Sequence, residues 1–252
     1  MQRPELSIIL PVYKNRNTVR ELHRQLSETL VEKSVEFVFV DDACPENSLE
    51  ILQEMAQADP RITVLALAQN IGQQRAVLAG MQHAQGEVLV IMDADLQDPP
   101  HAVPMLLEKL KEGHDVVFGG RAGHYQVGHR LLTSRLYKWT LHFLLKVPAN
   151  AGLFLAMKRA HLDALLALPI DTPHLVAMIG ALRLKNISVS VKRDERPSGM
   201  SAYTSWMRLK LGFGAAFWAL RWRLGFMPDT HNPISDHPLK EFIPSQYHGL
   251  GA

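Results

Sequence analysis

The chain has 252 residues, and its hydrophobic content of 47% is enough to bury the core of one large α/β domain. Its 27 Lys and Arg residues are nearly balanced by 25 Asp and Glu, so the net charge of +2 gives no argument for nucleic-acid binding. The single cysteine, Cys44, excludes an internal disulfide, and the start MQRPE lacks a signal peptide, so we expect a cytoplasmic location.

Strand and helix patterns alternate along the chain up to Gly120. Strands are expected at Leu6 to Val12, Glu36 to Val40, Ile62 to Ala68, Val88 to Met92 and Val116 to Phe118. Helices are expected between them, near Thr18 to Lys33, Ser48 to Ala58, Gln73 to Gln85 and Val103 to Glu112. This rhythm predicts an α/β fold with a doubly wound parallel sheet, whose ligands bind beyond the carboxyl ends of the strands.

The pattern changes after Gly120. A helix that carries Leu132, Leu136, Trp139 and Phe143 on one face is followed by a strand-like run at Leu153 to Met157, a helix, and a strand at Ile187 to Val191. We predict three parts: a main domain at residues 1–200, an amphipathic helical segment at 201–228, and an irregular tail at 229–252, which is rich in Pro, His and Gly.

Basic residues are concentrated towards the C-terminus. From Arg183 to Arg223 there are nine Lys or Arg against two acids. At the end of this stretch, Ser201 to Leu224 is predicted as a helix with Trp218 and Trp222 on its flank and an apolar run too short to span a bilayer. Its apolar stripe consists of Trp206, Leu209, Phe213, Phe217, Leu220 and Leu224. Such a helix resembles one that lies on an anionic membrane. The alternative is packing on its own domain or on a second copy of the chain in a homo-oligomer.

Two carboxylates end the fourth predicted strand. Asp93 and Asp95 are separated by one small residue, so an extended chain would point both side chains the same way. They would repel each other unless a cation lies between them, and oxygen ligands suit Mg²⁺ or Mn²⁺. Gln97 could add a neutral oxygen. The alternative is a solvated acidic loop in which Asp98 caps the next helix.

A second acidic pair, Asp41 and Asp42, ends the second predicted strand. Carboxylates at this place can accept hydrogen bonds from a ribose or a base. A helix-capping or solvated turn is the alternative. The sequence has no GxGxxG after its first strand, no Walker loop and no HExxH spacing, so neither a dinucleotide cofactor nor a zinc enzyme is expected.

Five stretches of the sequence resemble family 2 glycosyltransferases of the GT-A fold. They are PVYKN (11–15), FVFVDDACPENS (37–48), NIGQQRAVLAGMQHAQGEVLVIMDADLQDPP (70–100), GGR (119–121) and RPSGMSAY (196–203). The resemblance is collinear over residues 6–210. It is strongest to the branch that contains dolichyl-phosphate mannose synthase and the bacterial polyprenyl-phosphate sugar transferases.

The resemblance implies roles for three groups of residues. Those implied to hold the nucleotide are Pro11, Tyr13, Asn15, Asp41, Asp42, Asp93 and Ala94. Those implied to surround the Mg²⁺ or Mn²⁺ on the diphosphate are Asp93, Asp95 and Gln97. Those implied to face the phosphate of a lipid acceptor are Arg121, Arg130, Ser134, Arg196 and Ser201, and the implied catalytic set is Asp95, Arg121 and Arg130. Without the resemblance, Arg121 or Arg130 would be interpreted as a surface salt-bridge residue.

Two positions depart from the family pattern at binding contacts. Asn15 stands where the family usually carries Glu, and Ala202 replaces a usual Lys that would meet phosphate.

A third departure concerns the general base. Asn150 and Leu153 occupy positions at which many relatives carry an Asp. A sugar hydroxyl needs a base as it attacks, whereas a phosphate is already an anion near neutral pH, so the departure favours a phosphate acceptor. Asp171 or His174 could serve as a base towards a hydroxyl, and each is otherwise a capping or loop residue.

We therefore expect an inverting, metal-dependent glycosyltransferase at the cytoplasmic face of the cell membrane, which moves a sugar from a UDP- or GDP-sugar to a polyprenyl phosphate. The cation and the Arg groups would stabilise charge, and positioning would replace base catalysis. Two alternatives stay open. One is a transferase for a sugar hydroxyl in surface-polysaccharide or glycolipid assembly, and the other is a catalytically silent nucleotide-sugar binding module that acts through a partner protein.

Overall fold

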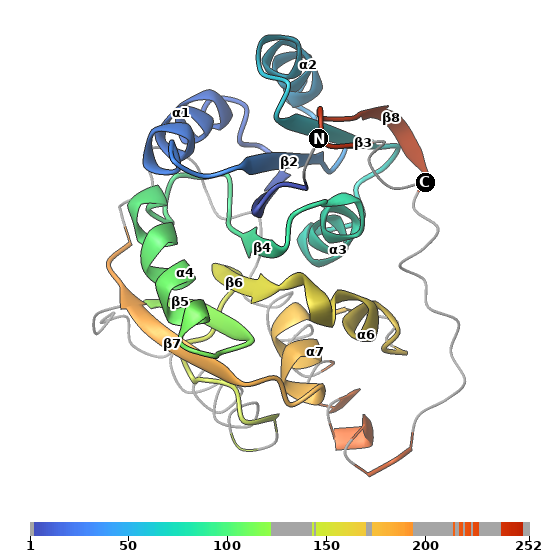
Figure 1. Cartoon of the computed structure of the whole chain (residues 1–252). Coiled ribbons are helices and arrows are strands. Elements are labelled where there is room, and N and C mark those ends of the chain that lie inside the picture. Colours follow the sequence, from blue (N-terminus) through green and yellow to red (C-terminus); the bar gives the residue numbers. More distant parts are fainter. Residues whose placement is uncertain are drawn as a thin grey trace, which may run out of the picture.

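A computed structural model describes residues 3–121, 143, 145–169, 173–193, 214, 217–218, 220–222, 224–226 and 238–248. Its strands are β1 (Leu6–Val12), β2 (Val35–Asp41), β3 (Ile62–Leu67), β4 (Val88–Ile91), β5 (Val116–Arg121), β6 (Leu155–Lys158), β7 (Asn186–Val191) and β8 (Leu239–Ile243). Over these residues the strands form one sheet in the order β7-β5-β6-β4-β1-β2-β3-β8 (Figure 1).

The centre of the sheet is parallel. β1 pairs with β2 and β4, and β2 pairs with β3, all in parallel. Every residue of β1, β2 and β3 is buried, as expected for strands that are covered on both faces. This confirms the predicted α/β fold and the five expected strands before Gly120, with ends that differ by a few residues.

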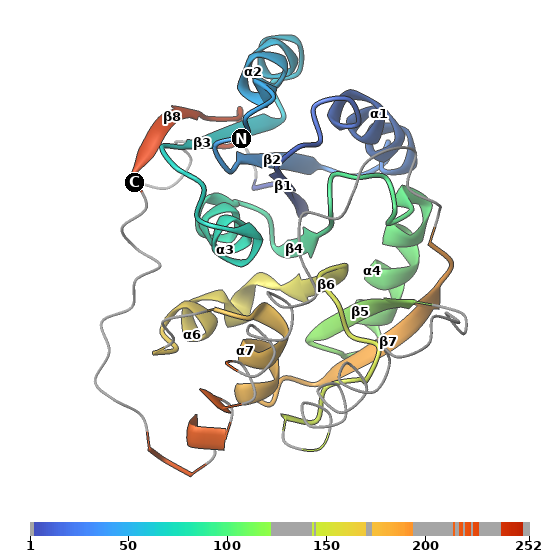
Figure 2. The ribbon, with the colours of Figure 1, turned by 180° about the vertical axis from the view of Figure 1, so that it is seen from behind.

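Helices cover both faces of the sheet (Figures 1 and 2). They are α1 (Val19–Thr29), α2 (Ser48–Ala58), α3 (Gln73–His83), α4 (Val103–Lys111), α6 (Leu162–Leu166) and α7 (Leu175–Ala181), with short 3-10 turns η1 (Pro100–Ala102) and η2 (Arg159–His161). Side chains alternate along the strands, so Ile8 and Phe39 face the core under α1, α2 and α4. Ile9 and Val38 face the other core, under α3, α6 and α7.

One antiparallel strand interrupts the parallel order. β6 lies between β4 and β5 and is antiparallel to both, while β5 and β7 are parallel. The strands expected at Leu153 to Met157 and Ile187 to Val191 are confirmed as β6 and β7. The resulting mixed sheet places the ends of β5 and β7 beside each other, with Arg121 opposite Val191.

The prediction of an irregular tail at residues 229–252 is wrong over Leu239–Ile243. This segment forms β8, which pairs antiparallel with β3 at the edge of the sheet. Its side chains are mostly exposed or half-buried, so the segment lacks the apolar alternation by which a strand is recognised. β8 is instead specified by its backbone pairing and by the residues that follow it.

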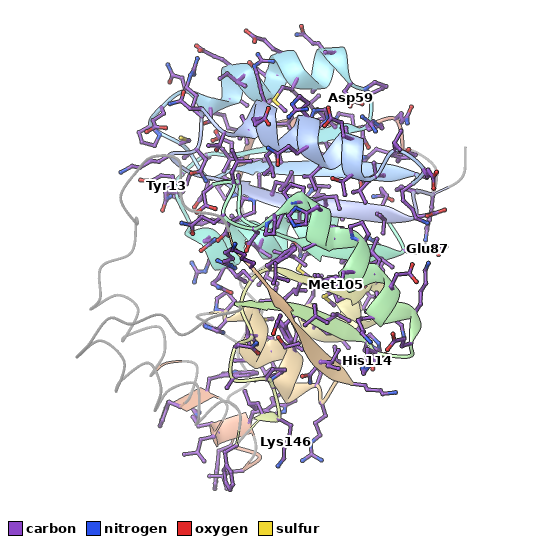
Figure 3. All side chains as sticks on the ribbon, turned by 90° about the vertical axis from the view of Figure 1, so that its left-hand side faces the viewer. Tyr13, Asp59, Glu87, Met105, His114 and Lys146 are labelled. Atoms are coloured by element: carbon purple, nitrogen blue, oxygen red, sulfur yellow. The ribbon has the colours of Figure 1, made fainter. Side chains whose placement is uncertain are left out.

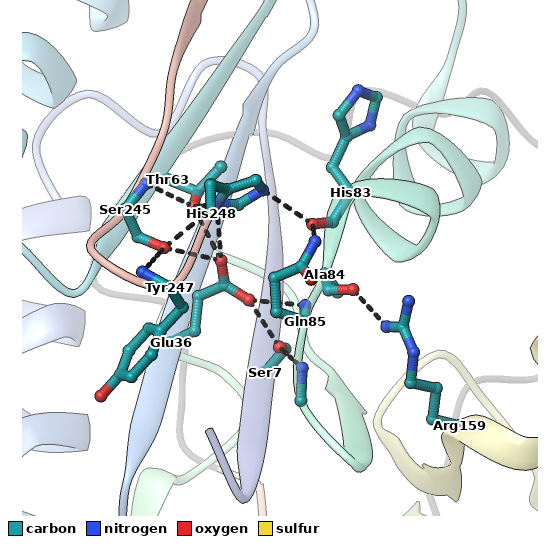
Figure 4. A network of polar contacts seen from close by, with 11 residues as sticks. Ser7, Glu36, Thr63, His83, Ala84, Gln85, Arg159, Ser245, Tyr247 and His248 are labelled. Atoms are coloured by element: carbon teal, nitrogen blue, oxygen red, sulfur yellow. Dashed lines mark hydrogen bonds and ion pairs between the residues drawn. The ribbon is translucent and has the colours of Figure 1, made fainter. Parts of the chain in front are cut away.

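Those following residues bind a buried acid at the amino end of the sheet. Glu36 of β2 is completely buried, and its carboxylate accepts four hydrogen bonds (Figure 4). The donors are Ser7 Oγ (2.7 Å), Gln85 N (2.8 Å), Thr63 Oγ1 (2.8 Å) and Ser245 Oγ (2.9 Å). His248 places Nδ1 3.5 Å from Glu36 Oε1 and Nε2 3.0 Å from the carbonyl oxygen of His83. The carboxylate thus joins β1, β2 and β3 to the C-terminal segment.

The predicted helix at Ser201 to Leu224 lies largely outside the described residues. Gly214, Phe217, Trp218 and residues 220–222 are helical. Trp218 donates from Nε1 to the Pro169 carbonyl (3.0 Å), and both Trp218 and Trp222 pack against the α7 core. In the part of the chain that the structure describes, no helix has both the length and the apolar content to cross a bilayer. The three-part division of the chain stays a prediction.

The Glu36 network gives a test of how the C-terminal segment is held. We expect Ser245→Ala to lower the free energy of unfolding by about 2 kcal/mol, because it removes a donor from a buried carboxylate. Ser190→Ala, at an exposed position of β7, is the matched control and should change stability by less than about 0.5 kcal/mol. Denaturant unfolding measures both, and equal effects of the two substitutions would contradict the role of Glu36.

Candidate active site at the carboxyl edge of the sheet

The loops that follow β1, β2, β3 and β4 meet at one edge of the sheet. Val12 is paired with Asp41, and Asp41 with Ala66, so these three strands end side by side. Figure 3 shows Tyr13 at this end of the sheet and Glu87, which precedes β4, at the other. The structure therefore brings the predicted nucleotide residues Pro11, Tyr13, Asn15, Asp41, Asp42, Asp93 and Ala94 to the same edge.

Asp42 is buried and binds the turn between β3 and α3. Its carboxylate accepts hydrogen bonds from Ile71 N (2.7 Å), Gly72 N (3.0 Å) and Asn70 Nδ2 (3.0 Å). Burial raises the pKa of Asp42, and the two backbone donors oppose that shift. Gly72 has a φ of +87°, a conformation that favours glycine. Asp42 thus holds the turn that begins α3. The sequence alone could not separate this structural role from the predicted role in nucleotide binding.

Asp41 lies beside it with a different environment. Asp41 is 5% exposed, and its Oδ1 accepts a hydrogen bond from the Cys44 backbone N–H at 3.3 Å. Burial is the main reason that the pKa of Asp41 rises to about 6, and the charge of Asp42 raises it further. Near neutral pH Asp41 is therefore a buried carboxylate, and a hydrogen-bond donor on a bound molecule would stabilise its charge.

The acidic loop after β4, residues 93–98, is held in place from two sides. Thr18 Oγ1, at the start of α1, donates to the Ala94 carbonyl, and Gln73 of α3 donates to Asp93. Asp95 is 6% exposed and accepts from Gln97 N at 3.1 Å, while Leu96 has a φ of +61°. The loop is thus a tight turn that buries Asp95.

The donor set of this loop is compatible with a hard divalent cation. Asp93 and Asp95 offer carboxylate oxygens from one turn, and the Gln97 amide adds a neutral oxygen. The described residues contain no cluster of three or more His, Cys, Asp or Glu suited to a metal. The proposed ligands are two carboxylates and one amide, which is a different kind of set, and phosphate oxygens would complete the coordination of the ion.

Arg193 is a residue that the sequence analysis missed. Its Nη2 lies 2.6 Å from Oδ1 of the fully buried Asp98, an ion-pair distance without the alignment of a directed hydrogen bond. Burial raises the pKa of Asp98 to about 7, Arg193 opposes the rise, and Asp93 and Asp95 add to it. No side chain caps α4, so the interpretation of Asp98 as a helix cap is wrong.

The acceptor half of the predicted site is only partly described. Arg121 ends β5, and Arg130, Ser134, Arg196 and Ser201 lie outside the described residues, as does Asp171. A Cβ at Gly120 would lie 2.1 Å from Asn150 Nδ2 and 2.3 Å from Ser188 Oγ. Only glycine at this position lets these two polar side chains approach the strand just before Arg121.

His174 is a helix cap in this structure. Its Nδ1 accepts a hydrogen bond from Ala177 N (3.4 Å) at the start of α7, and burial lowers the pKa of His174 to about 4. Between the two roles considered for His174, the structure supports capping.

Comparison with known proteins identifies the family. The sequence model described as "Glycosyl transferase family 2" matches residues 7–164. The chain belongs to glycosyl transferase family 2. The predicted resemblance is therefore confirmed, and the match covers all the loops of the carboxyl edge that follow β1 to β4.

Two relatives from bacteria match most of this chain. The glycosyltransferase YkcC of Bacillus subtilis (strain 168) is 32% identical over 212 residues, which are 82% of this chain and 66% of YkcC. An undecaprenyl-phosphate 4-deoxy-4-formamido-L-arabinose transferase of Pseudomonas aeruginosa (strain LESB58) is 30% identical over 213 residues, 82% of this chain and 63% of that protein. The chain thus spans slightly less than two thirds of the length of these family 2 relatives.

Solved structures show the same fold. Glucosyl-3-phosphoglycerate synthase of Mycobacterium tuberculosis, in complex with Mn²⁺, UDP and glucosyl-3-phosphoglycerate, superimposes with a TM-score of 0.61 at 20% identity, over 90% of this chain and 82% of that one. The mannosyltransferase PcManGT of Pyrobaculum calidifontis, in complex with GDP-Man and Mn²⁺, gives 0.57 at 18% identity, over 90% and 74%. At these identities the likeness concerns the fold, and it confirms the GT-A arrangement predicted for this family 2 chain.

The environment of Asp41 predicts a pH dependence of stability. Its pKa is about 6 in the folded protein and lower in the unfolded chain, so its stabilising contribution is complete below about pH 4 and is lost as the pH rises through 6. We expect Asp41→Asn to be more stable than the wild type by about 1 to 3 kcal/mol at pH 8 and to lose this advantage near pH 4. Denaturant unfolding across this range measures the difference. Asp163→Asn, on the exposed side of α6, should show no such trend, and parallel curves for Asp41→Asn and the wild type would contradict the assignment.

Proposed function

We propose that this protein moves a sugar from a UDP- or GDP-sugar to a polyprenyl phosphate. The observation that carries the proposal is the acidic loop with Asp93 and Asp95, which lies at the same edge of the sheet as Asp41. The relative named as an undecaprenyl-phosphate 4-deoxy-4-formamido-L-arabinose transferase supports the acceptor class. The structural neighbours with bound UDP or GDP-Man support the donor class.

A divalent cation, Mg²⁺ or Mn²⁺, would be held by Asp93, Asp95 and Gln97. When bound, such an ion neutralises the negative charge that develops on a departing nucleoside diphosphate. Mn²⁺ in the complexes of two structural neighbours supports the metal class. Asp41 would accept hydrogen bonds from the nucleoside, with Pro11, Tyr13, Asn15 and Ala94 around it, while Asp42 keeps the β3–α3 turn in place.

The chain's own residues would position an acceptor that needs no general base. A lipid phosphate attacks as an anion, so the amide of Asn150 is sufficient where a hydroxyl acceptor would need a carboxylate. Asn150 Nδ2 lies near Gly120, next to Arg121, and an amide N–H can donate to a phosphate oxygen. Arg121, Arg130, Ser134, Arg196 and Ser201 would face this phosphate, and direct displacement would invert the sugar configuration.

A donor and acceptor panel tests this function. Purified protein is incubated with Mn²⁺ and each of several UDP- and GDP-sugars, with undecaprenyl phosphate or with free sugars as acceptor. We expect transfer to undecaprenyl phosphate from one class of donor. Transfer to sugars alone would contradict a lipid phosphate acceptor and support a sugar hydroxyl instead. Tight nucleotide binding without turnover of any donor would favour a catalytically silent binding module.

The cation site gives a second test. We expect Asp95→Ala to abolish the Mn²⁺-dependent part of nucleoside diphosphate binding, since it removes a charged ligand from a site with two. Isothermal titration with UDP and GDP, in Mn²⁺ or in EDTA, measures this part. Asp163→Ala removes an exposed carboxylate from α6 and serves as the control. Unchanged Mn²⁺-dependent affinity in Asp95→Ala would refute the metal assignment.

We also propose that the protein acts peripherally at the cytoplasmic membrane surface. Phe217, Leu220 and Leu224 of the predicted apolar stripe are 63%, 42% and 59% exposed, while Trp218 and Trp222 on its flank pack against the domain. Arg221 lies over the ring of Phe217, which adds a cation beside the apolar side chains. Aromatic and basic side chains together suit an anionic lipid surface.

Point substitutions test this proposal better than truncation, because β8 follows the segment and belongs to the sheet. We expect the double variant Phe217→Ser/Leu220→Ser to bind phosphatidylglycerol vesicles at least about tenfold more weakly in a sedimentation assay. Val31→Ser is the matched control, since Val31 is 78% exposed on the α1 side of the molecule. Equal vesicle binding by the wild type and the double variant would overturn the peripheral assignment.

A further inference from the structure

A buried ion pair joins two loops of the carboxyl edge that are far apart in the sequence. Asp98 is the last residue of the acidic loop, and Arg193 is the second residue after β7. Their side chains are 0% and 16% exposed, and Arg193 Nη2 lies 2.6 Å from Asp98 Oδ1. Figure 2 shows the end of β7 beside α4, the helix that follows Asp98 and η1. The pair thus connects the acidic loop after β4 with the end of β7, the edge strand three places away in the same sheet.

Stability alone does not account well for such a pair. Removing two charges from water costs several kcal/mol per ion, and an apolar pair of similar volume is often as stable. The site also contains Asp93 and Asp95, whose charges act unfavourably on Asp98. Three carboxylates in one loop would repel one another and push the loop open unless a cation lay among them. Arg193 supplies a fixed positive charge on the side of the loop that faces β7.

We propose that Asp98 and Arg193 form a positioning pair, in which Arg193 holds Asp98 and thereby fixes the turn on which Asp93 and Asp95 converge on the divalent cation. This inference rests on the proposed function. Both residues act through the loop and contact neither nucleotide nor acceptor in this role. Thr18 and Gln73 hold the loop from the side of α1 and α3, so Arg193 completes its support from β7.

The test uses the single variants Arg193→Met and Asp98→Asn and the double variant. For each, isothermal titration gives the Mn²⁺ gain, which is the ratio of the dissociation constant of UDP or GDP in EDTA to that in Mn²⁺. We expect each single variant to reduce the Mn²⁺ gain about ten- to a hundredfold, as loss of a residue that orients a metal ligand does. The double variant should be no worse than the more severe single, because the two residues act as one unit. Arg193→Lys keeps the charge and should retain part of the gain.

A matched control separates positioning from stability. Arg61→Met removes a half-buried guanidinium that pairs with Asp59 at 2.7 Å, just before β3 at the amino end of the sheet. We expect it to lower the melting temperature and to leave the Mn²⁺ gain unchanged. Should Arg193→Met fail to fold, the nearly isosteric Asp98→Asn still decides. Circular dichroism and thermal unfolding check that this variant keeps the native fold before its Mn²⁺ gain is measured.

Two outcomes would overturn the inference and leave the proposed function standing. If the folded variants of Asp98 and Arg193 keep a Mn²⁺ gain within about threefold of the wild type, the pair is only structural. If the effects of the two single variants add in the double variant, the residues do not act as a unit. A wild-type protein without any Mn²⁺ gain would contradict the proposed function and the inference with it. If instead the wild type shows a Mn²⁺ gain and the variants keep it, only the inference is contradicted.

Discussion

Burial of carboxylates at one edge of an apolar sheet is the constraint on which this molecule depends. Asp41, Asp42 and Asp98 are almost completely shielded from solvent, and burial raises the pKa of each. A carboxylate in such a place must be hydrogen-bonded, paired or protonated. Asp42 receives two backbone N–H groups from the β3–α3 turn, and Asp98 receives Arg193. Each of these interactions holds a separate loop at the carboxyl edge, so the conformation of the edge depends on the partners of its buried carboxylates.

The amino end of the same sheet also contains a buried carboxylate, that of Glu36, but its role is structural. Glu36 accepts hydrogen bonds from three hydroxyls and a backbone N–H, and its surroundings are closed by Ser245 and His248. There the carboxylate is saturated with neutral donors and joins strands to the C-terminal segment. At the carboxyl edge, Asp93 and Asp95 add negative charge to the turn that also contains the Asp98–Arg193 pair, and this charge favours a bound cation. One sheet thus uses buried acids for cohesion at one end and, in the proposed function, for binding at the other.

The sequence predicted the parts of this arrangement that local pattern determines. Apolar runs such as Leu6–Val12 mark strands covered on both faces, and they place Asp93 and Asp95 at the end of a strand, where a cation site is predicted. β8 was missed because an edge strand with exposed side chains carries no apolar alternation. Arg193 was missed because its partner is remote in sequence. A helix cap was considered for Asp98 only as an alternative, because Asp before a helix is often a cap. The separate roles of Asp41 and Asp42 depend on which donors the next turn presents, and no local pattern contains that information.

In the proposed function, a divalent cation binds between Asp93 and Asp95 of the acidic loop. Crystals grown with Mn²⁺ and UDP or GDP, with diffraction data recorded at the manganese absorption edge, locate the ion directly. We expect one anomalous peak within ligand distance of carboxylate oxygens of both Asp93 and Asp95, about 2.0 to 2.3 Å away. A nucleotide bound at this edge without a manganese peak, or a peak elsewhere on the protein, would contradict it.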